Sequence, residues 1–298
     1  MSSISAVIVT FNTGNKYFDN FLTIVHQVDN IIIVDNGSNQ ETVNTLSKIK
    51  LDYPNVIIIY NKENLGLAKA QNIGFDKAIE LKSQWVLMLD DDSRAAPDMV
   101  KSMVSFYNKH KEPEKLAIIG PNIKEVEVDS KPLYYGVNNK PLKLRQEFKS
   151  EEYIEVFFVI ASGSLIKVDI YQKIGKFRED FFIDYIDIEY GLRVCSLGYQ
   201  VIVIKDAILY HRLGNKKTHK FLNLIAISFN HNALRKYYIY RNRIKVWKLY
   251  ISKFPIFILY DIASAFFHLL KIIFLEKNKF SKIIAVFKGV KAGFFEKI

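Results

Sequence analysis

An apolar run that ends in three carboxylates, Gln84-Trp85-Val86-Leu87-Met88-Leu89-Asp90-Asp91-Asp92, has the length and composition of a buried strand. Three similar runs rich in Val, Ile and Leu precede it, at residues 4–10, 30–35 and 55–60. Segments with helical spacing separate these runs, at residues 17–27, 41–49 and 65–81. This alternation predicts an α/β fold: a mostly parallel sheet with helices on both faces.

Polar side chains stand where the predicted strands end. Thr10 and Asn12 follow the first strand, Asp35 ends the second, and the three carboxylates end the fourth. Because open parallel sheets bind ligands at the carboxyl ends of their strands, we expect these residues to line one site.

The three adjacent carboxylates indicate a metal site. Asp90, Asp91 and Asp92 repel one another unless a cation shares them, and oxygen ligands suit Mg²⁺ or Mn²⁺. A divalent cation there could hold a diphosphate and neutralise the charge that forms on a departing nucleotide. An acidic turn that caps a helix near residues 95–97 is the alternative. The position after a buried strand favours the metal.

Residues 61–75 resemble an anion-binding loop and helix start. Gly66 permits close approach of the backbone to a ligand, the following helix directs N–H groups at an anion, and Lys69 adds positive charge. An ordinary loop would have the same spacing. The sequence lacks the glycine patterns of dinucleotide-dependent oxidoreductases and of P-loop enzymes, which disfavours both classes.

The stretch from Phe181 to Arg193 places acids among large apolar residues at a predicted helix start. A carboxylate in apolar surroundings has a raised pKa and can act as a general base. Helix capping is the simpler role, which we favour for Asp184, whereas we favour catalysis for Asp187. His211 follows a further predicted strand at residues 199–204. A lone histidine is more often structural, but its position after this strand favours contact with a metal or a phosphate.

The net charge of +11 is unevenly distributed along the chain. Residues 1–210 hold 24 Lys and Arg against 28 Asp and Glu, whereas residues 211–298 hold 18 against 3. A basic, aromatic and apolar tail of this kind is typical of a surface that meets an anionic membrane or a nucleic acid. Packing of the tail on the catalytic domain or on a second subunit is the alternative.

The apolar stretch at residues 254–275 is as long as a membrane span. Asp261, His268 and Lys271 interrupt it, so we expect a helix that lies on the membrane instead of crossing it. The single cysteine, Cys195, excludes an internal disulfide, and the first residues do not have the pattern of a secretory signal. Both features fit a reducing compartment.

Several motifs, taken in order, resemble those of family-two inverting glycosyltransferases with the GT-A fold. They are Val7-Ile8-Val9-Thr10-Phe11-Asn12, Val34-Asp35-Asn36-Gly37-Ser38, residues 61–74, and Leu89-Asp90-Asp91-Asp92-Ser93. Residues 182–193 are similar to the corresponding segment of bacterial rhamnosyltransferases, whose relatives include galactofuranosyltransferases. The motifs span about residues 4–214, so the resemblance implies a GT-A catalytic domain over residues 1–214 and a basic helical region over residues 215–298.

The resemblance implies a role for single residues. The nucleotide-sugar site would comprise Thr10, Asn12, Asp35, Asn64, Gly66, Lys69, Asp90 and Asp91. Asp90, Asp92 and His211 would hold Mg²⁺ or Mn²⁺, and Ser162, Gly163 and Asp184 would lie beside the donor sugar and the acceptor. Asp187 would be the base, although Ile186 before it and Glu189 after it depart from the common family pattern.

The implied reaction is inverting transfer of L-rhamnose from dTDP-L-rhamnose to a hydroxyl of a lipid-linked cell-surface glycan. It would take place at the cytoplasmic face of the bacterial cell membrane, to which the tail would attach peripherally. Transfer of galactofuranose or another hexose from a UDP-sugar is the alternative donor. A nucleotidyltransferase and a non-catalytic membrane or nucleic-acid binder are the other classes. We expect no nucleic-acid partner, and a homo-oligomer stays open.

Overall fold

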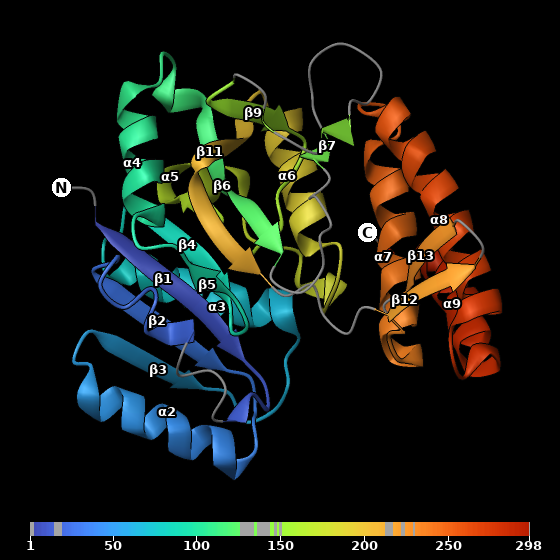
Figure 1. The fold of residues 1–298 in the computed structure, drawn as a ribbon, viewed down its shortest axis with the longest axis horizontal. Coiled ribbons are helices and arrows are strands. Elements are labelled where there is room, and N and C mark those ends of the chain that lie inside the picture. Colours follow the sequence, from blue (N-terminus) through green and yellow to red (C-terminus); the bar gives the residue numbers. More distant parts are fainter. Residues whose placement is uncertain are drawn as a thin grey trace. The chain divides into compact units, whose positions relative to one another are not determined.

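The computed structural model describes residues 3–14, 20–125, 134–135, 144–145, 148, 151–211, 217–221, 224–228 and 230–297. The chain divides into two compact units, coloured along the sequence in Figure 1. One consists of Met1–Phe182 and Ile186–Arg212, and we call it the sheet unit. The other consists of Ile183–Tyr185 and Leu213–Ile298, and we call it the helical unit.

The sheet unit is built around a sheet that contains nine of the described strands. Its first half is parallel and runs in the order β3 (Val56–Tyr60), β2 (Asn30–Asp35), β1 (Ile4–Thr10) and β4 (Trp85–Asp90). The next strand, β10 (Leu165–Lys167), is antiparallel to β4, and β6 (Leu116–Glu125) and β11 (Gln200–His211) follow it, parallel to each other. Two short strands, β5 (Arg94–Ala95) and β9 (Tyr153–Val156), pair antiparallel with β11. The prediction of a mostly parallel sheet is confirmed.

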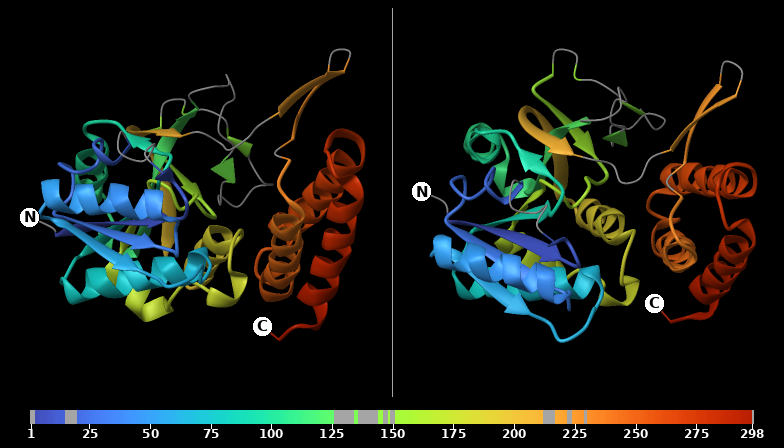
Figure 2. Two further views of the ribbon diagram at one scale, coloured as in Figure 1. Left: turned by 90° about the horizontal axis from the view of Figure 1, so that it is seen from below. Right: turned by 60° about the horizontal axis from the view of Figure 1, so that its bottom comes forward.

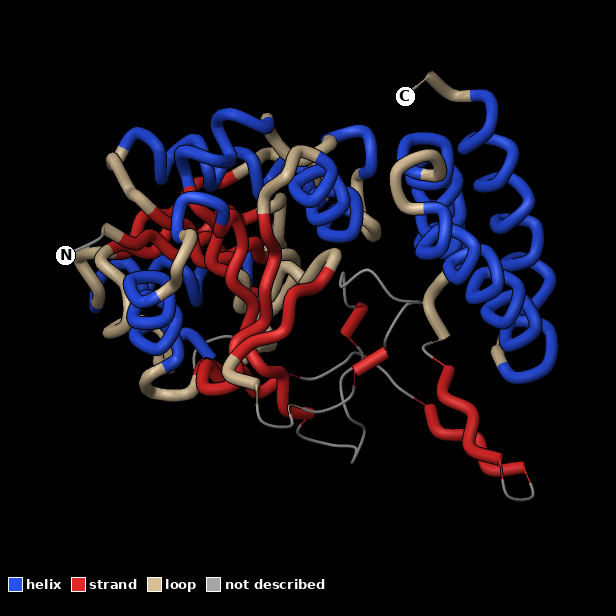
Figure 3. The backbone as a smooth tube through the Cα atoms, turned by 90° about the horizontal axis from the view of Figure 1, so that it is seen from above, coloured by secondary structure: helices blue, strands red, loops and turns tan. Residues whose placement is uncertain are grey.

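Helices lie on both faces of this sheet, as the views in Figures 2 and 3 show. They are α2 (Gln40–Asp52), α3 (Leu67–Glu80), α4 (Met99–Lys109), α5 (Val168–Ile174) and α6 (Ile186–Ser196). Asn39 begins α2 as an N-cap, because its side chain accepts a hydrogen bond from the Thr42 N–H. Short elements complete the unit: the 3₁₀ turns Pro113–Lys115 and Glu179–Phe181, and the paired strands β7 (Tyr134–Tyr135) and β8 (Leu144–Arg145).

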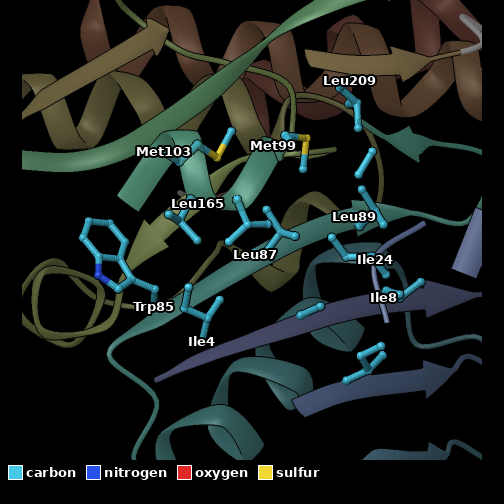
Figure 4. Packing of buried hydrophobic residues seen from close by; sticks show 14 of the residues in the cluster. Ile4, Ile8, Ile24, Trp85, Leu87, Leu89, Met99, Met103, Leu165 and Leu209 are labelled. Atoms are coloured by element: carbon cyan, nitrogen blue, oxygen red, sulfur yellow. The ribbon is translucent and has the colours of Figure 1, made fainter. Parts of the chain in front are cut away.

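A hydrophobic core lies between one face of the sheet and the helices α2 and α4, and part of it is shown in Figure 4. Ile8 of β1 and Leu87 of β4 pack there with Met99 and Met103 of α4. Each fully buried side chain of this size stabilises the fold by roughly 1.5–3 kcal/mol relative to exposure. The core therefore fixes the strands whose carboxyl ends carry the polar residues.

The prediction of a helix over residues 17–27 is wrong for residues 22–27. Residues 15–19 lie outside the described part of the chain, and residues 22–27 form turns. Side chains explain the difference: Thr23 Oγ1 accepts the Ala95 N–H, and Gln27 Nε2 donates to the Ala96 carbonyl. These bonds tie the segment to the last residue of β5 and to the residue after it, and turns place both side chains within reach.

The helical unit contains α7 (Ala233–Tyr250), α8 (Pro255–Leu275), α9 (Lys279–Phe295) and the hairpin of β12 (Lys217–Phe221) with β13 (Leu224–Ser228). Asn232 caps α7 through the Arg235 N–H, and Pro255 begins α8. Helix α9 lies close against α7, since a Cβ at Gly289 would be 2.4 Å from the Tyr237 carbonyl oxygen. The expected helical character of the tail is confirmed from Ala233 onward, whereas the described residues between 217 and 228 form a hairpin instead of a helix.

Candidate functional site

Three strands of the parallel half end at the same edge of the sheet. Thr10 of β1 is in register with Asp35 of β2, and Val9 is in register with Asp90 of β4. The Thr10 hydroxyl donates to Asp35 Oδ1 at 3.1 Å, and both residues are buried. The Ser38 N–H donates to Asp35 Oδ2 at 3.0 Å, but a carboxylate has further lone pairs that a ligand can use. The structure therefore brings Thr10, Asp35 and Asp90 together, as expected.

Asn12 joins this edge through the loop after β1. Its backbone is left-handed (φ 55°), which Asn tolerates better than most residues. The Asn12 N–H donates to Ser38 Oγ, and Asn12 Oδ1 accepts the Asn39 N–H at 2.8 Å. The loops after β1 and β2 are thus held against each other.

Asn36 organises the neighbouring loop, although the sequence did not single it out for a role. Its amide nitrogen donates to Asn64 Oδ1 at 2.9 Å, and its amide oxygen accepts from the Leu65 N–H and from Asn61 Nδ2. Asn64 Oδ1 also accepts the Gly66 N–H. These bonds give Asn64 a structural role in the loop. Its expected contact with the nucleotide stays a prediction. The signal available in the sequence was the Asp35-Asn36-Gly37 turn at a strand end.

The backbone and the packing around Gly66 require a glycine, and its expected contact with a ligand stays a prediction. It is the N-cap of α3 with φ at 86°, a conformation that disfavours side chains with a Cβ. The space that a Cβ would fill is taken by the Phe182 ring, whose Cδ2 would lie 2.5 Å away. Lys69, one turn into α3, forms a 3.9 Å ion pair with Glu179 in which both side chains are about half exposed. Such a pair is weak, so the Lys69 ammonium stays accessible to an anion.

The three consecutive aspartates have different surroundings. The Thr13 hydroxyl donates to Asp91, and burial raises the pKa of the Asp91 carboxyl. Asp92 is exposed, and its Oδ1 lies 3.7 Å from His211 Nδ1. Helix α4 begins after Asp98, so the triplet does not cap it.

Asp90, Asp92 and His211 form a candidate metal-binding set. One ligand atom from each lies within 4.8 Å of the other two. Carboxylate oxygens with an imidazole nitrogen are suited to Mn²⁺, and carboxylates to Mg²⁺. The donor set therefore fits the divalent cation that the resemblance implies.

His211 reaches this cluster because its strand is longer than predicted. Instead of ending at residue 204, β11 continues to His211, with a register irregularity against β6 between Val203 and Ile208. Such bulges redirect side chains near functional sites. Residues 212–216 lie outside the described part of the chain.

Two buried serines support His211. Ser93 Oγ lies 2.6 Å from His211 Nδ1, and the Ser162 hydroxyl donates to Ser93 Oγ at 2.7 Å. Ser162 in turn accepts the Asp90 N–H at 3.1 Å. Gly163, next to Ser162, donates its N–H to the Met88 carbonyl of β4. The expected position of Ser162 and Gly163 beside the donor sugar stays a prediction. Ser93 was missed because its partner is 118 residues away in the chain.

Asp187 is the second residue of α6 and lines a pocket in the sheet unit. The pocket is mostly apolar, with Val159, Phe177 and Tyr190 in its wall, and Met88 and Ser164 also line it. Asp187 Oδ1 accepts the Ile188 N–H at 2.9 Å. The expected setting of an acid among apolar groups is therefore present.

Glu189, which stands close to Asp187 in the sequence, has a structural role. It is buried, and Arg193 donates to both of its carboxylate oxygens, at 3.1 and 2.6 Å. An ion pair with two parallel hydrogen bonds is strong and fixed in geometry. The expected role of Asp187 as the base stays a prediction.

Asp184 belongs to the helical unit together with Ile183 and Tyr185. Arg235 binds its carboxylate through Nε at 2.9 Å and Nη2 at 3.0 Å. Asn242, which is fully buried, donates to the carbonyls of Ile183 and Asp184. The expected contact of Asp184 with a donor sugar or an acceptor stays a prediction.

Comparison with known proteins identifies relatives by sequence. Residues 5–175 match the family model described as glycosyl transferase family 2. The dTDP-rhamnosyl transferase RfbF of Shigella flexneri is 29% identical over 302 residues, which cover 97% of this chain and 96% of the relative. The O-antigen chain rhamnosyltransferase RfbN of Salmonella typhimurium is 23% identical over 70% of this chain and 66% of the relative.

Solved structures show a similar fold at low sequence identity. A structure of GalNAc-T7 with UDP, GalNAc and Mn²⁺ superimposes with a TM-score of 0.63 at 14% identity, covering 86% of this chain and 49% of that chain. The mannosyltransferase PcManGT of Pyrobaculum calidifontis, in complex with GDP-Man and Mn²⁺, gives 0.59 at 12% identity, covering 99% and 76%. These similarities support the fold alone.

Proposed function

The chain belongs to glycosyl transferase family 2 and has the GT-A fold, and from this premise we propose that it transfers L-rhamnose from dTDP-L-rhamnose. The acceptor would be a hydroxyl of a lipid-linked cell-surface glycan, and the anomeric configuration would be inverted. One observation carries the proposal for sugar transfer. The metal-binding set of Asp90, Asp92 and His211 stands at the strand ends, while Asp187 shares a pocket with Met88 of the same strand, β4.

The choice of rhamnose rests on sequence similarity. RfbF is a dTDP-rhamnosyl transferase and aligns with 97% of this chain, the helical unit included. Transfer of galactofuranose or another hexose from a UDP-sugar is the second candidate. Calorimetry with dTDP and UDP would separate the two, since clear preference for UDP would contradict the dTDP-sugar assignment. An assay of transfer and hydrolysis with a panel of nucleotide sugars would then identify the sugar.

Each part of the site has a task in the proposed reaction. Thr10, Asn12 and Asp35 would hold the base and ribose, and Asn64, Gly66, Lys69 and Asp91 would line the rest of the nucleotide site. A divalent cation, when bound by Asp90, Asp92 and His211, would neutralise charge on the diphosphate. Ser162 and Gly163 would lie beside the donor sugar.

Asp187 would accept the proton of the acceptor hydroxyl. The hydroxyl oxygen would then form a bond to the anomeric carbon from the face opposite the nucleotide, while the bond from that carbon to the diphosphate oxygen breaks. The proton ends on Asp187 and the electron pair on the diphosphate.

Replacement of Asp187 by Asn tests this role. Asn keeps an oxygen that can accept the Ile188 N–H, so the start of α6 is retained while the base is lost. We expect kcat for transfer to fall by roughly 10²–10⁴-fold, with donor affinity in calorimetry nearly unchanged. Asp180→Asn, a change of a more exposed acid nearby in the chain, is the matched control. Transfer within tenfold of the parent would contradict the assignment.

We also propose that the enzyme is attached peripherally to the cytoplasmic face of the bacterial membrane, where a lipid-linked acceptor would be available. The support is the charge of residues 211–298, with 18 Lys and Arg against 3 Asp and Glu. Each basic residue near an anionic surface contributes about 1 kcal/mol to attachment.

A further inference from the structure

The outward surface of α8 is apolar along the length of the helix. Six of its side chains, Ile256, Leu259, Ile262, Phe266, Phe267 and Phe274, are each between 38% and 70% exposed. Their spacing of three, four and seven residues, with one adjacent pair, places them on one side of the helix. We call this set the apolar face of α8. Exposed apolar surface of this extent marks a surface that binds a partner.

The polar residues of α8 do not interrupt this face. Asp261 is buried and forms a 3.1 Å ion pair with Arg243, and it also accepts hydrogen bonds from Trp247 Nε1 and the Tyr185 hydroxyl. His268 and Lys271 are partly buried. The residues that interrupt the apolar stretch in the sequence thus lie off its exposed face in the structure.

Positive charge on the helical unit is not balanced by its own acids. The three acidic residues of the tail all bind buried cations: Asp261 binds Arg243, Glu276 binds Lys236 and Lys282, and Glu296 binds Lys245. Six lysines are exposed and form no ion pair with any described residue: Lys253, Lys277, Lys279, Lys288, Lys291 and Lys297. The unit therefore combines an apolar face with unpaired positive charge at its surface.

We propose that the helical unit inserts the apolar face of α8 into the border of the acyl chains of an anionic bilayer, with α8 lying along the membrane surface. The exposed lysines would bind the anionic headgroups. This proposal extends the peripheral attachment proposed above: it names the residues that enter the lipid and makes the apolar contact, rather than the charge, the larger contribution.

Helix α8 is long and apolar enough to cross a membrane, but its contacts favour lying on the surface. A crossing would take Asp261 towards the middle of the bilayer and separate it from Arg243 and Trp247. A charged residue at that depth costs about 2.5–3.5 kcal/mol even on the most favourable scales. A helix in the surface plane keeps all these bonds and still buries the apolar face, as interfacial amphipathic helices do.

A second copy of the chain would match this surface less well. It could cover the apolar face of α8, but its own exposed lysines would approach those of the first copy. Like charges in proximity repel, whereas anionic headgroups neutralise them. The charge therefore favours a bilayer as the partner.

Vesicle binding by the full-length protein tests the proposal. The probes are vesicles of phosphatidylcholine alone and of phosphatidylcholine with phosphatidylglycerol, at low and high salt. We expect the double variant Phe266→Ser/Phe267→Ser to bind both kinds roughly a hundredfold more weakly, at either salt concentration. We expect Lys288→Gln/Lys291→Gln to bind the anionic vesicles roughly thirtyfold more weakly at low salt and nearly normally at high salt. Leu51→Ser, an 82% exposed apolar residue of the sheet unit, should change neither result.

The depth of α8 is measured with a Phe267→Trp variant and brominated lipids. We expect stronger quenching by bromine near the headgroup end of the acyl chain than by bromine near the bilayer centre. Stronger quenching at the centre would show a crossing helix and overturn the proposal. The proposal would also be overturned if the parent binds no vesicles and is a dimer in light scattering, while the Phe266→Ser/Phe267→Ser variant is not a dimer. Donor hydrolysis without lipid tests the proposed function separately, and we expect it to be unchanged in all these variants.

Discussion

Substitution of Gly66 by Ala tests how the loop before α3 is built. Gly66 has φ at 86°, and an added Cβ would lie 2.5 Å from Cδ2 of Phe182. Two costs follow. A left-handed conformation for Ala costs roughly 1–2 kcal/mol. Overpacking against a ring costs typically another 1–3 kcal/mol, because the ring must move. We expect Gly66→Ala to lower the free energy of unfolding of the sheet unit by roughly 2–5 kcal/mol.

Gly198 provides the matched control. Its φ is 85°, nearly that of Gly66, but nothing lies within 4 Å of the position of an added Cβ. Gly198→Ala should therefore show the backbone cost alone, roughly 1–2 kcal/mol. The difference between the two variants measures the contact with Phe182.

The assay is urea unfolding of the full chain, followed by the fluorescence of Trp85 in a Trp247→Phe background. The chain has only these two tryptophans, so the signal then reports the sheet unit. The added change Phe182→Ala should restore most of the difference between Gly66→Ala and Gly198→Ala, because it removes the ring. Equal destabilisation by the two glycine changes, within about 0.5 kcal/mol, would refute the reasoning, since surface changes without a mechanism stay within that range.

Three further predictions concern the metal, its support and acid stability. Activity should require Mg²⁺ or Mn²⁺, and full turnover in excess chelator would contradict the metal site of Asp90, Asp92 and His211. Ser93→Ala should weaken Mn²⁺ binding by roughly 10–100-fold in calorimetry, because partners that orient a metal ligand have effects of this size. Ser93→Thr keeps the hydroxyl and should restore the binding. Stronger Mn²⁺ binding by Ser93→Ala would contradict this role and would mean that Ser93 competes with the metal for His211. Burial and the nearby Arg235 guanidinium lower the pKa of His231 from 6.5 to about 4, so the unfolded chain binds a proton that the folded helical unit resists. The contribution of His231 to stability should therefore be complete above pH 6.5 and be lost between pH 6.5 and 4, by at most roughly 3 kcal/mol. Burial lowers the pKa of His268 to about 4 as well, so His231→Gln should remove one of two such contributions and make the profile of Trp247 unfolding less steep.

Local patterns in the sequence were sufficient for the parallel half of the sheet unit. The strand β1 was predicted with its observed bounds, and the alternation of strands with α2 and α3 indicated a mostly parallel sheet. These features depend on hydrophobic periodicity over five to fifteen residues, which the sequence displays directly. The meeting of Thr10, Asp35 and Asp90 at one edge follows from the same pattern, because parallel strands align their carboxyl ends.

Contacts between distant residues could be learned only from the tertiary structure. Ser93 and Asn36 have no distinguishing sequence pattern of their own, and their roles depend on His211 and Asn64, which other elements deliver. The turns at residues 22–27 replace a predicted helix because Thr23 and Gln27 bond to a loop about seventy residues further along the chain.

In the helical unit, too, the sequence determined the composition, whereas the tertiary structure decided which side chains are exposed. Composition alone identified a basic, apolar tail, and in the sequence Asp261 interrupts its apolar stretch. The structure pairs Asp261 with Arg243 and turns Phe266, Phe267 and Phe274 outward. The sequence specifies which side chains a helix carries. Which of them are buried and which are exposed depends on the helices that pack against it. Burial and ion pairing are properties of those neighbours, which only the folded chain brings together.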